Sequence, residues 1–181
     1  MEPFPFEEVA LEDMLTARER RARLQQLMIQ EYGHPLICLT LNIPGPRKVF
    51  PLIPEAFAEG CRRVESALCA LGLTPEACRQ IREKTGFEAI YSVKADPLVL
   101  KKAMISIEDK DRIGRLFDID VLNADGAKIS REDLNEVPRT CLLCGRPAHI
   151  CSRSRSHSVK ELTCEIERIL QKEFSFPLDQ P

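Results

Sequence analysis

Hydrophobic and polar residues alternate most regularly in residues 114–122, whose sequence is GRLFDIDVL. Three apolar residues alternate there with Asp118 and Asp120, and a period of two places the apolar side chains on one face of a β-strand and both carboxylates on the other. The turn sequence NADG follows at 123–126, and residues 127–130 are predicted to return as an antiparallel strand. The pattern therefore predicts a hairpin whose first strand has an acidic face.

Apolar residues at helical spacing predict most of the remaining structure. Residues 7–32 contain no glycine or proline and form the longest such segment, which Gly33 ends. The other predicted helices are 54–72, 74–86, 96–105 and a closing helix from Ser158, and further strands are predicted at 36–43 and 88–93. Residues 1–6 are expected to be a short arm on the core, and 174–181 a short proline-terminated end.

Composition restricts the class of protein. A length of 181 residues fits one domain spanning 1–181, and 44% hydrophobic with 30% charged residues is typical of a soluble globular chain. The net charge of −2 and the pI near 6.0 argue against a nucleic-acid partner. No run of about 18 apolar residues and no basic, apolar leader occurs, so we expect no membrane contact and a cytoplasmic location. The eight cysteines are then expected to be reduced thiols or metal ligands.

Basic residues gather in three places. A buried strand runs into the turn PGPRK, which presents Arg47 and Lys48 at the strand end, where phosphate groups are often bound. Arg153 and Arg155 alternate with serines, a spacing that lets two guanidiniums face one polyphosphate. The arginines at positions 18, 20, 21 and 23 of the first helix are interpreted instead as a solvated face that pairs with Glu19.

The acidic face of the strand has two interpretations. Aspartate is depleted in strands, and two neighbouring carboxylates repel each other unless a cation or a basic partner offsets their charge. Magnesium commonly takes one or two carboxylates together with substrate phosphate oxygens, a ligand set that Asp118 and Asp120 suit. The alternative is an ordinary half-solvated strand with an acidic outer face.

Residues 139–157 are rich in cysteine and arginine. Cys141 and Cys144 have the C-x-x-C spacing of a zinc knuckle. The residues that could complete four ligands are Cys151, His149 and His157, and we take the three cysteines with His157 as the candidate set. No second C-x-x-C or H-x-x-x-H pair follows, so a structural zinc site, a redox pair and buried thiols all stay open. The redox pair is disfavoured because no thioredoxin-like strand and helix flank it.

Three motifs together resemble a known family. They are LTLNIPGP at 39–46 with Lys48, GRLFDIDV at 114–121, and a third set made of Arg139, Cys141, Cys144, Ala148, Cys151, Arg153 and His157. In this order they resemble the citrate lyase holo-acyl-carrier-protein synthases, also called apo-citrate lyase phosphoribosyl-dephospho-coenzyme A transferases. The similarity covers nearly the whole chain, with Phe117 at a position where the family pattern suggests tryptophan.

The resemblance implies an enzyme that takes triphosphoribosyl-dephospho-coenzyme A and attaches it, as a phosphodiester, to a serine of the apo-acyl-carrier (gamma) subunit of citrate lyase. Diphosphate is released. In this nucleotidyl transfer Asp118 and Asp120 would be the catalytic residues and would hold Mg²⁺. The basic residues assigned to the triphosphate by charge and position are Arg47, Lys48, Arg115, Arg153 and Arg155.

The acidic strand beside a hairpin also resembles the metal-binding strand of the nucleotidyltransferase fold. This likeness implies an α+β domain with a mixed sheet flanked by helices, including the long helices at both ends of the chain. The glycine-serine turn of that superfamily is not evident, because Gly114 lies four residues before Asp118 without a following serine.

Two other functions stay open beside the transferase. One is a non-catalytic, zinc-containing adaptor that docks on the citrate lyase carrier subunit through its arginines. The other is a redox protein built on Cys141 and Cys144. The effect of Asp120→Ala would separate them, because neither the adaptor nor the redox protein has a use for two neighbouring carboxylates.

Overall fold

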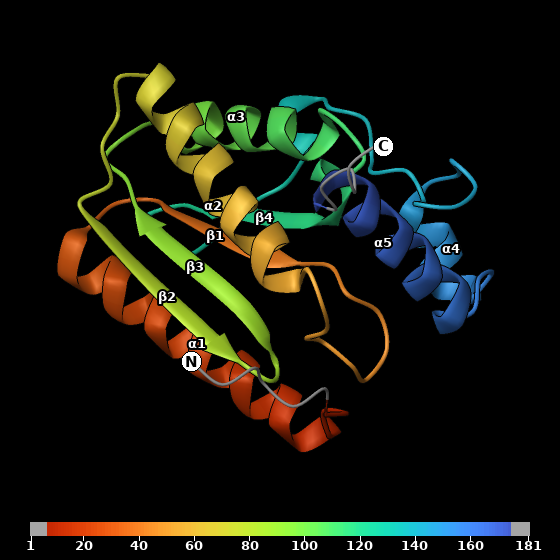
Figure 1. The fold of residues 1–181 in the computed structure, drawn as a ribbon. Coiled ribbons are helices and arrows are strands. Elements are labelled where there is room, and N and C mark those ends of the chain that lie inside the picture. The colour runs from red at the N-terminus through yellow and green to blue at the C-terminus, as the bar shows by residue number, and fades with distance from the viewer. Residues whose placement is uncertain (1–6, 175–181) are drawn as a thin grey trace, which may run out of the picture.

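Five antiparallel strands form one sheet in the computed structural model, which describes residues 7–174 (Figure 1). The strands are β1 (Leu36–Leu41), β2 (Ala77–Glu83), β3 (Gly86–Ser92), β4 (Phe117–Leu122) and β5 (Lys128–Ile129), in the order β2-β3-β1-β4-β5. Each neighbouring pair is antiparallel, because hairpins join β2 to β3 and β4 to β5, and β1 runs opposite to both of its neighbours. The expectation of a mixed sheet is therefore corrected: the sheet in residues 7–174 is antiparallel throughout.

Helices cover both faces of the sheet (Figure 1). The helices are α1 (Leu11–Tyr32), α2 (Ile53–Ala70), α3 (Pro97–Asp109), α4 (Ala148–Ser154) and α5 (Val159–Phe174), and single 3-10 turns lie at Gly114–Leu116 and Glu132–Leu134. α1 lies across one face, whereas α2 and α3 cover the opposite face and α5 packs beside α2, with α4 next to α5. The α+β class agrees with the prediction, as do the long helices toward both ends.

The alternation along the strands explains these layers. In β1, Ile37 and Leu39 are fully buried in the main core under α2 and α3. The residues that alternate with them, Leu36 and Cys38, point to the other face, where they pack with Met28 of α1. Each fully buried aliphatic side chain contributes about 1.5–3 kcal/mol, so the two faces of the sheet supply the main stabilising interaction of the domain.

Residues 77–83 form the edge strand β2, although we predicted a helix over 74–86. Both faces of β2 make polar contacts with helices, so no hydrophobic alternation identifies it as a strand. On one face Gln80 Nε2 lies 3.9 Å from Cys61 Sγ of α2, and on the other Glu83 pairs with Arg20 of α1 at 2.6 Å. Charged side chains are common on edge strands because they hinder pairing with other chains.

The other predicted elements are present with shifted ends. The hairpin turn after β4 forms as expected, with Asn123 N–H donating to Ala127 O at 2.7 Å, but β5 contains only two residues. The strand predicted at 88–93 corresponds to β3, and the helix from Asp96 extends to Asp109. The arm at 1–6 and the end of the chain after residue 174 lie outside the described residues.

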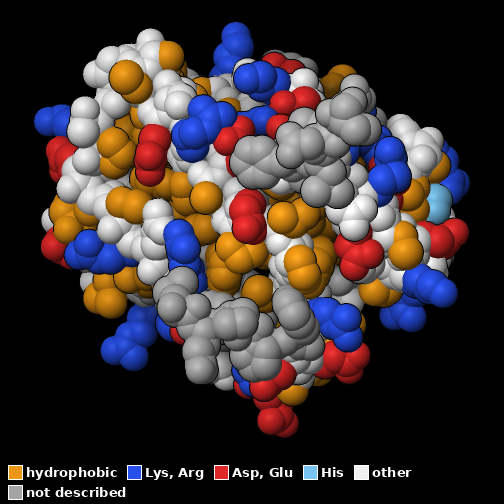
Figure 2. Space-filling view, viewed as in Figure 1, with side chains coloured by type: hydrophobic (Ala, Val, Ile, Leu, Met, Phe, Trp, Pro, Cys, Tyr) orange, Lys and Arg blue, Asp and Glu red, His pale blue; other side chains and the backbone are white. Residues whose placement is uncertain are grey.

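The surface carries charges of both signs. Figure 2 shows Lys and Arg side chains next to Asp and Glu side chains, around an area of hydrophobic groups on the visible face. None of the helices within residues 7–174 is long and apolar enough to cross a membrane. The eight cysteines all lie in the described part of the chain and are free thiols.

Candidate active site and Cys/His cluster

Asp118 and Asp120 lie on one face of β4, as the alternation predicts. The apolar residues that alternate with them are fully buried in the main core, while the two aspartates are half-buried on the opposite face, which α1 covers. Asp118 lies opposite Thr40 of β1, and Asp120 lies opposite Cys38. The side chain of Asp118 is 48% exposed, so a ligand can reach its carboxylate.

Each carboxylate of the pair has a basic partner. Arg139 Nη1 lies 3.2 Å from Asp118 Oδ1, and Lys128 Nζ lies 2.7 Å from Asp120 Oδ1. Partial burial, followed by the neighbouring Asp120 carboxylate, raises the pKa of Asp118 above its ordinary value, although Arg139 opposes this change. The second oxygen of each carboxylate accepts no hydrogen bond from residues 7–174 and is available to a ligand.

The backbone between the two aspartates is fixed from α3. β5 pairs only with Val121 and Leu122, so Ile119 has no strand partner on that side. Glu108 accepts a hydrogen bond from Ile119 N–H at 2.9 Å, and Lys101 Nζ donates one to Ile119 O at 2.9 Å. Glu108 is 2% exposed and Lys101 is 5% exposed. Two buried charged side chains therefore replace the missing strand and hold the spacing of the carboxylates.

A cavity of about 170 Å³ opens beside Asp118 on the α1 face. Its polar lining consists of Arg18, Arg21, Thr40, Asn42, Lys48, Thr85, Glu88 and Asp118. Arg21 Nη2 donates to Glu88 Oε1 at 2.7 Å, and Glu88 is only 3% exposed. This smaller cavity thus combines three basic side chains with two acidic ones, next to the Asp118 carboxylate.

The arginines of α1 differ from the sequence interpretation. Arg20 and Arg21 pair with Glu83 and Glu88 of the β2-β3 hairpin instead of Glu19. Positions 18 and 21 lie on one helix face, which α1 turns toward the smaller cavity. The spacing of Arg18 and Arg21 is visible in the sequence. The same spacing occurs on a cavity wall and on a solvated surface, so the sequence alone did not identify these two arginines as part of a site.

A larger cavity of about 610 Å³ lies between the 3-10 turn before β4, the segment 139–158 and α5. Its basic lining consists of Arg115, Arg139, His149, Arg155 and His157, and its apolar lining includes Leu142, Leu162 and Ile166. Asn42 lines both cavities. Arg139 also connects them, because it lines the larger cavity and contacts Asp118 in the smaller one.

The five basic residues predicted to bind phosphate are divided between these places. Lys48 lines the smaller cavity, and Arg115 and Arg155 line the larger one. Arg47 and Arg153 are exposed and line neither of the two cavities. The structure therefore places three of the five in the walls of the two cavities, only Lys48 in the cavity that contains Asp118, and adds Arg139 and the α1 arginines Arg18 and Arg21 to these walls.

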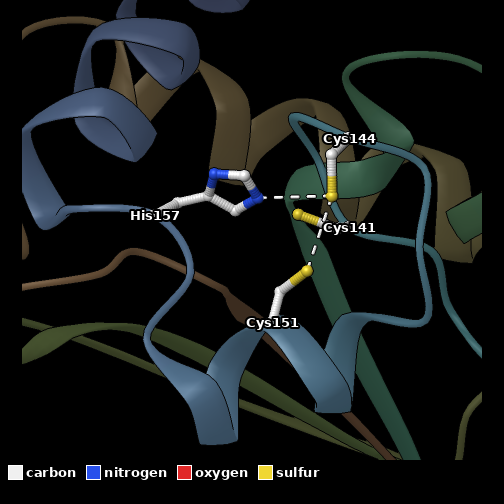
Figure 3. Close-up of side chains that lie close together, drawn as sticks. All are labelled: Cys141, Cys144, Cys151 and His157. Atoms are coloured by element: carbon white, nitrogen blue, oxygen red, sulfur yellow. Dashed lines mark hydrogen bonds between the residues drawn. The ribbon is translucent and has the colours of Figure 1, made fainter.

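Cys141, Cys144, Cys151 and His157 converge on one point (Figure 3), and their ligand atoms all lie within 4.8 Å of one another. Cys144 Sγ lies 3.5 Å from Cys151 Sγ and 3.3 Å from His157 Nε2. Three thiols and an imidazole are a ligand set typical of tetrahedral zinc. The cluster could therefore bind a metal such as zinc. His149, the other candidate, is not part of it and lines the larger cavity.

The local backbone explains why these side chains meet. Cys141 N–H donates to Arg146 O at 2.6 Å, and Gly145 N–H donates to Cys141 O at 3.3 Å, which closes the turn after Cys144. Gly145 has a φ of +72°, a conformation that glycine adopts without strain. α4 then brings Cys151 to the cluster, and the chain turns back before α5. The C-x-x-C-G sequence is therefore the local determinant of this site.

The cluster favours a thiolate at Cys144. The Arg146 guanidinium, followed by further donors that include His157, lowers the pKa of the Cys144 thiol to about 5. Burial raises the pKa of Cys151 instead. Since the thiolate is the form that binds metal, the lowered pKa of Cys144 favours metal binding at neutral pH.

Comparison of the amino-acid sequence with known proteins identifies a family that matches this chain. The family model described as apo-citrate lyase phosphoribosyl-dephospho-CoA transferase matches residues 9–173. A Vibrio cholerae protein named probable apo-citrate lyase phosphoribosyl-dephospho-CoA transferase is 38% identical over 162 residues, which are 89% of this chain and 91% of that protein. A Streptococcus pyogenes protein of the same name is 38% identical over 178 residues, 95% of this chain and 91% of its own length.

A longer relative shares the same region. The chain is 38% identical over 165 residues to a Haemophilus influenzae protein named Protein CitXG, and the match spans 90% of this chain but 35% of that protein. The sequence resemblance is thus confirmed over nearly the whole chain, and the matched range contains the acidic strand and the Cys/His cluster. This chain belongs to the apo-citrate lyase phosphoribosyl-dephospho-CoA transferase family.

Proposed function

We propose that this chain transfers the phosphoribosyl-dephospho-coenzyme A group from triphosphoribosyl-dephospho-coenzyme A to a serine of the apo-acyl-carrier subunit of citrate lyase, with release of diphosphate. The observation that carries the proposal is the acidic face of β4, on which Asp118 lines the smaller cavity and contacts Arg139, a residue in the wall of the larger cavity, while Asp120 lies on the same face. Family membership supports it, since the relatives' names describe a phosphoribosyl-dephospho-CoA transfer that involves apo-citrate lyase.

The larger cavity suits the donor. Pockets for ligands of this kind are roughly 300–1,000 Å³ in volume, a range that includes the cavity of about 610 Å³ and excludes the one of about 170 Å³. Arg115, Arg139 and Arg155 make the wall of this cavity positive, which attracts phosphate groups, and the apolar wall suits the uncharged parts of the donor. We therefore assign the donor to the larger cavity, with its phosphates directed toward Asp118.

The chemistry is a displacement at phosphorus. The serine oxygen forms a bond to the α-phosphorus of the donor while the bond from that phosphorus to the bridging oxygen breaks, and diphosphate leaves. The serine proton must be removed, because a hydroxyl at its ordinary pKa is a weak nucleophile. One carboxylate of the acidic pair, or the metal bound to it, would help to remove that proton. The surrounding guanidiniums stabilise the negative charge that develops on diphosphate.

Magnesium fits the acidic pair. Asp118 and Asp120 each have one carboxylate oxygen that residues 7–174 leave available, and magnesium sites often use two carboxylates with phosphate oxygens and water. Within residues 7–174 only the Cys/His cluster is a group of three or more metal-ligating side chains, so the remaining magnesium ligands would come from the donor and from water. Bound magnesium would supply Lewis acidity at the phosphate oxygens.

Zinc fits the Cys/His cluster, and we propose that the cluster holds it as a structural ion. Zn–S bonds of about 2.3 Å and Zn–N bonds of about 2.0 Å in a tetrahedron separate two sulfurs by about 3.8 Å, and sulfur from nitrogen by about 3.5 Å. The observed separations of 3.5 Å and 3.3 Å are close to these values. Mass-spectrometric metal analysis should find one zinc per chain. The assignment would be contradicted if the purified protein contained no zinc and added zinc left its unfolding free energy unchanged.

The transfer is tested by the intact mass of apo-carrier subunit after incubation with this chain, Mg²⁺ and the donor. We expect a mass gain equal to the donor minus diphosphate, and no gain with Asp118→Asn/Asp120→Asn. Glu136→Gln is the matched control, because Glu136 is an acid outside both cavities. Absence of a gain with folded wild-type protein would refute the transferase proposal.

An adaptor that only docks on the carrier is the second candidate. The observation that favours it is the exposed position of Arg153, outside both cavities and beside the Cys/His cluster. The adaptor would bind the carrier without changing its mass, and it would bind equally well after the double aspartate substitution. The same experiment therefore separates the two functions.

A further inference from the structure

Arg139 contacts β4 at the position where the acidic face begins. Its Nη2 donates to Arg115 O at 2.9 Å and to Phe117 O at 2.8 Å, while Nη1 contacts Asp118 Oδ1 at 3.2 Å. One guanidinium therefore binds two backbone carbonyls and one carboxylate of the proposed active site. The side chain of Arg139 is 20% exposed, so these contacts are partly shielded from water.

The main chain of Arg139 is held by the segment that contains the Cys/His cluster. Arg139 precedes Cys141 by two residues, its carbonyl accepts from Ala148 N–H at 2.7 Å, and Thr140 forms a β-bridge with Pro147. Arg115 Nη2 also donates to Thr140 O. On the N-terminal side, residues 136–139 have no regular secondary structure. The position of Arg139 is therefore set by the segment on its C-terminal side.

The segment has little hydrophobic core of its own. In residues 140–158 only Cys141 and Cys151 are buried, and both belong to the cluster, whereas 143–147 and 152–156 are exposed. Small metal-binding segments of this kind obtain their folding free energy from the metal. The main core is formed by the sheet with α2, α3 and α5 and includes no cluster ligand. Metal loss should therefore loosen this segment without unfolding the domain.

We propose that the Cys/His cluster, as a zinc site, positions Arg139 against Asp118 and thereby makes the transfer reaction dependent on zinc. Arg139 is the positioning residue that connects the two sites, and it also forms part of the wall of the larger cavity. This inference rests on the proposed function, because it assigns Asp118 to the reacting phosphate. It extends that function by linking the Cys/His cluster, as a second metal site, to the geometry of the acidic pair.

Trypsin cleavage tests the coupling without the reaction. Cleavage after Arg139 should be slow in the zinc-loaded wild type, because the guanidinium is bound to β4. Cleavage should be at least about tenfold faster in Cys144→Ser, in line with the effect of removing supporting contacts at a metal site. Cys164→Ser is the matched control, since Cys164 is an exposed free thiol of α5 outside the cluster. Equal cleavage rates in Cys144→Ser and Cys164→Ser would overturn the proposal. If Cys144→Ser does not fold, His157→Asn replaces it.

A double-mutant cycle tests the connection to the reaction. Arg139→Ala and Cys144→Ser should each lower the transfer rate constant roughly 10- to 100-fold, and only Cys144→Ser should lose zinc. If the cluster acts through Arg139, the double variant should be no slower than the slower single variant. Multiplied effects, or a zinc-free wild type, would overturn the coupling. A wild type that shows zinc-dependent protection at Arg139 but no transfer would refute the proposed function instead.

Discussion

Glu108 is the residue whose replacement should destabilise this domain most clearly. It lies in α3 at 2% exposure and makes two strong contacts. Its Oε1 accepts the Ile119 N–H hydrogen bond at 2.9 Å, and its Oε2 lies 2.6 Å from Arg131 Nη2. Arg131 is itself 11% exposed at its side chain. Glu108 thus satisfies an unpaired strand amide and forms a well-shielded ion pair at once.

The expected cost depends on the groups that each substitution leaves without a partner. Glu108→Ala leaves the buried Ile119 amide without an acceptor and removes one of the two carboxylates that pair with Arg131, which keeps Asp109. Breaking a buried pair from one side costs about 3–5 kcal/mol, and because Arg131 keeps one partner we expect the low end, about 3 kcal/mol. Glu108→Gln keeps an acceptor for the amide but removes the charge, so we expect about 1–2 kcal/mol. With a urea m-value of about 2 kcal/mol/M, Glu108→Ala should lower the midpoint by about 1.5 M.

Urea unfolding followed by circular dichroism measures these differences. The control is Glu136→Gln, an acid outside this network, which should change the unfolding free energy by less than about 0.5 kcal/mol. A loss below about 1 kcal/mol in Glu108→Ala would equal that of an exposed ion pair. That result would refute the reasoning, because it would mean that water reaches Ile119 and Arg131 in the folded protein.

Three further substitutions test other parts of the structure. Asp96→Ala removes the side chain that caps α3, and thermal unfolding should show a loss of about 1 kcal/mol. Gly114→Ala would place a Cβ 2.4 Å from Ile107 O, so we expect a loss of about 3 kcal/mol by the same assay, and an unchanged midpoint would show that this backbone yields. The third test concerns Asp111. Burial alone would raise the pKa of its carboxyl group, but Arg63 and a backbone donor outweigh burial and lower it. The contribution of Asp111 to the unfolding free energy is therefore present above about pH 4 and is lost below it. The stability difference between wild type and Asp111→Asn should therefore shrink as the pH falls from 6 to 3, and a constant difference would contradict the assignment.

Features that depend on neighbouring residues could be predicted from the sequence. The period of two in β4 placed Asp118 and Asp120 on one face without any knowledge of their surroundings. The C-x-x-C-G turn likewise brings Cys141 and Cys144 together through contacts within a few residues. Cys151 and His157 follow closely enough in the chain for one short helix to return them to the same point. Residue order therefore predicts this local geometry, although it does not choose between His149 and His157 as the fourth member of the cluster.

Features that depend on distant segments could not be predicted in the same way. Arg21 pairs with Glu88, which lies 67 positions away, and a helix places arginine with the same spacing whether it faces water or a cavity. β2 lacks apolar alternation because helices contact both of its faces through polar side chains, so its helix-like start signal was misleading. The division of the basic residues between two cavities depends on how 139–158 packs against β4, for which the spacing of Arg153 and Arg155 contains no signal.

The acidic pair is held by segments that reach β4 from different directions, and this arrangement separates stability from function. Lys101 and Glu108 fix the backbone from within the core, so their loss affects the fold as a whole. Lys128 and Arg139 contact the carboxylates themselves from a two-residue strand and from the Cys/His segment, neither of which contributes a fully buried residue to the main core. Substitutions on the α3 side should therefore yield unstable protein, whereas substitutions on the Cys/His side should yield folded protein that transfers slowly. The core thus sets the spacing of the two carboxylates, and the peripheral segments set the charge that surrounds them.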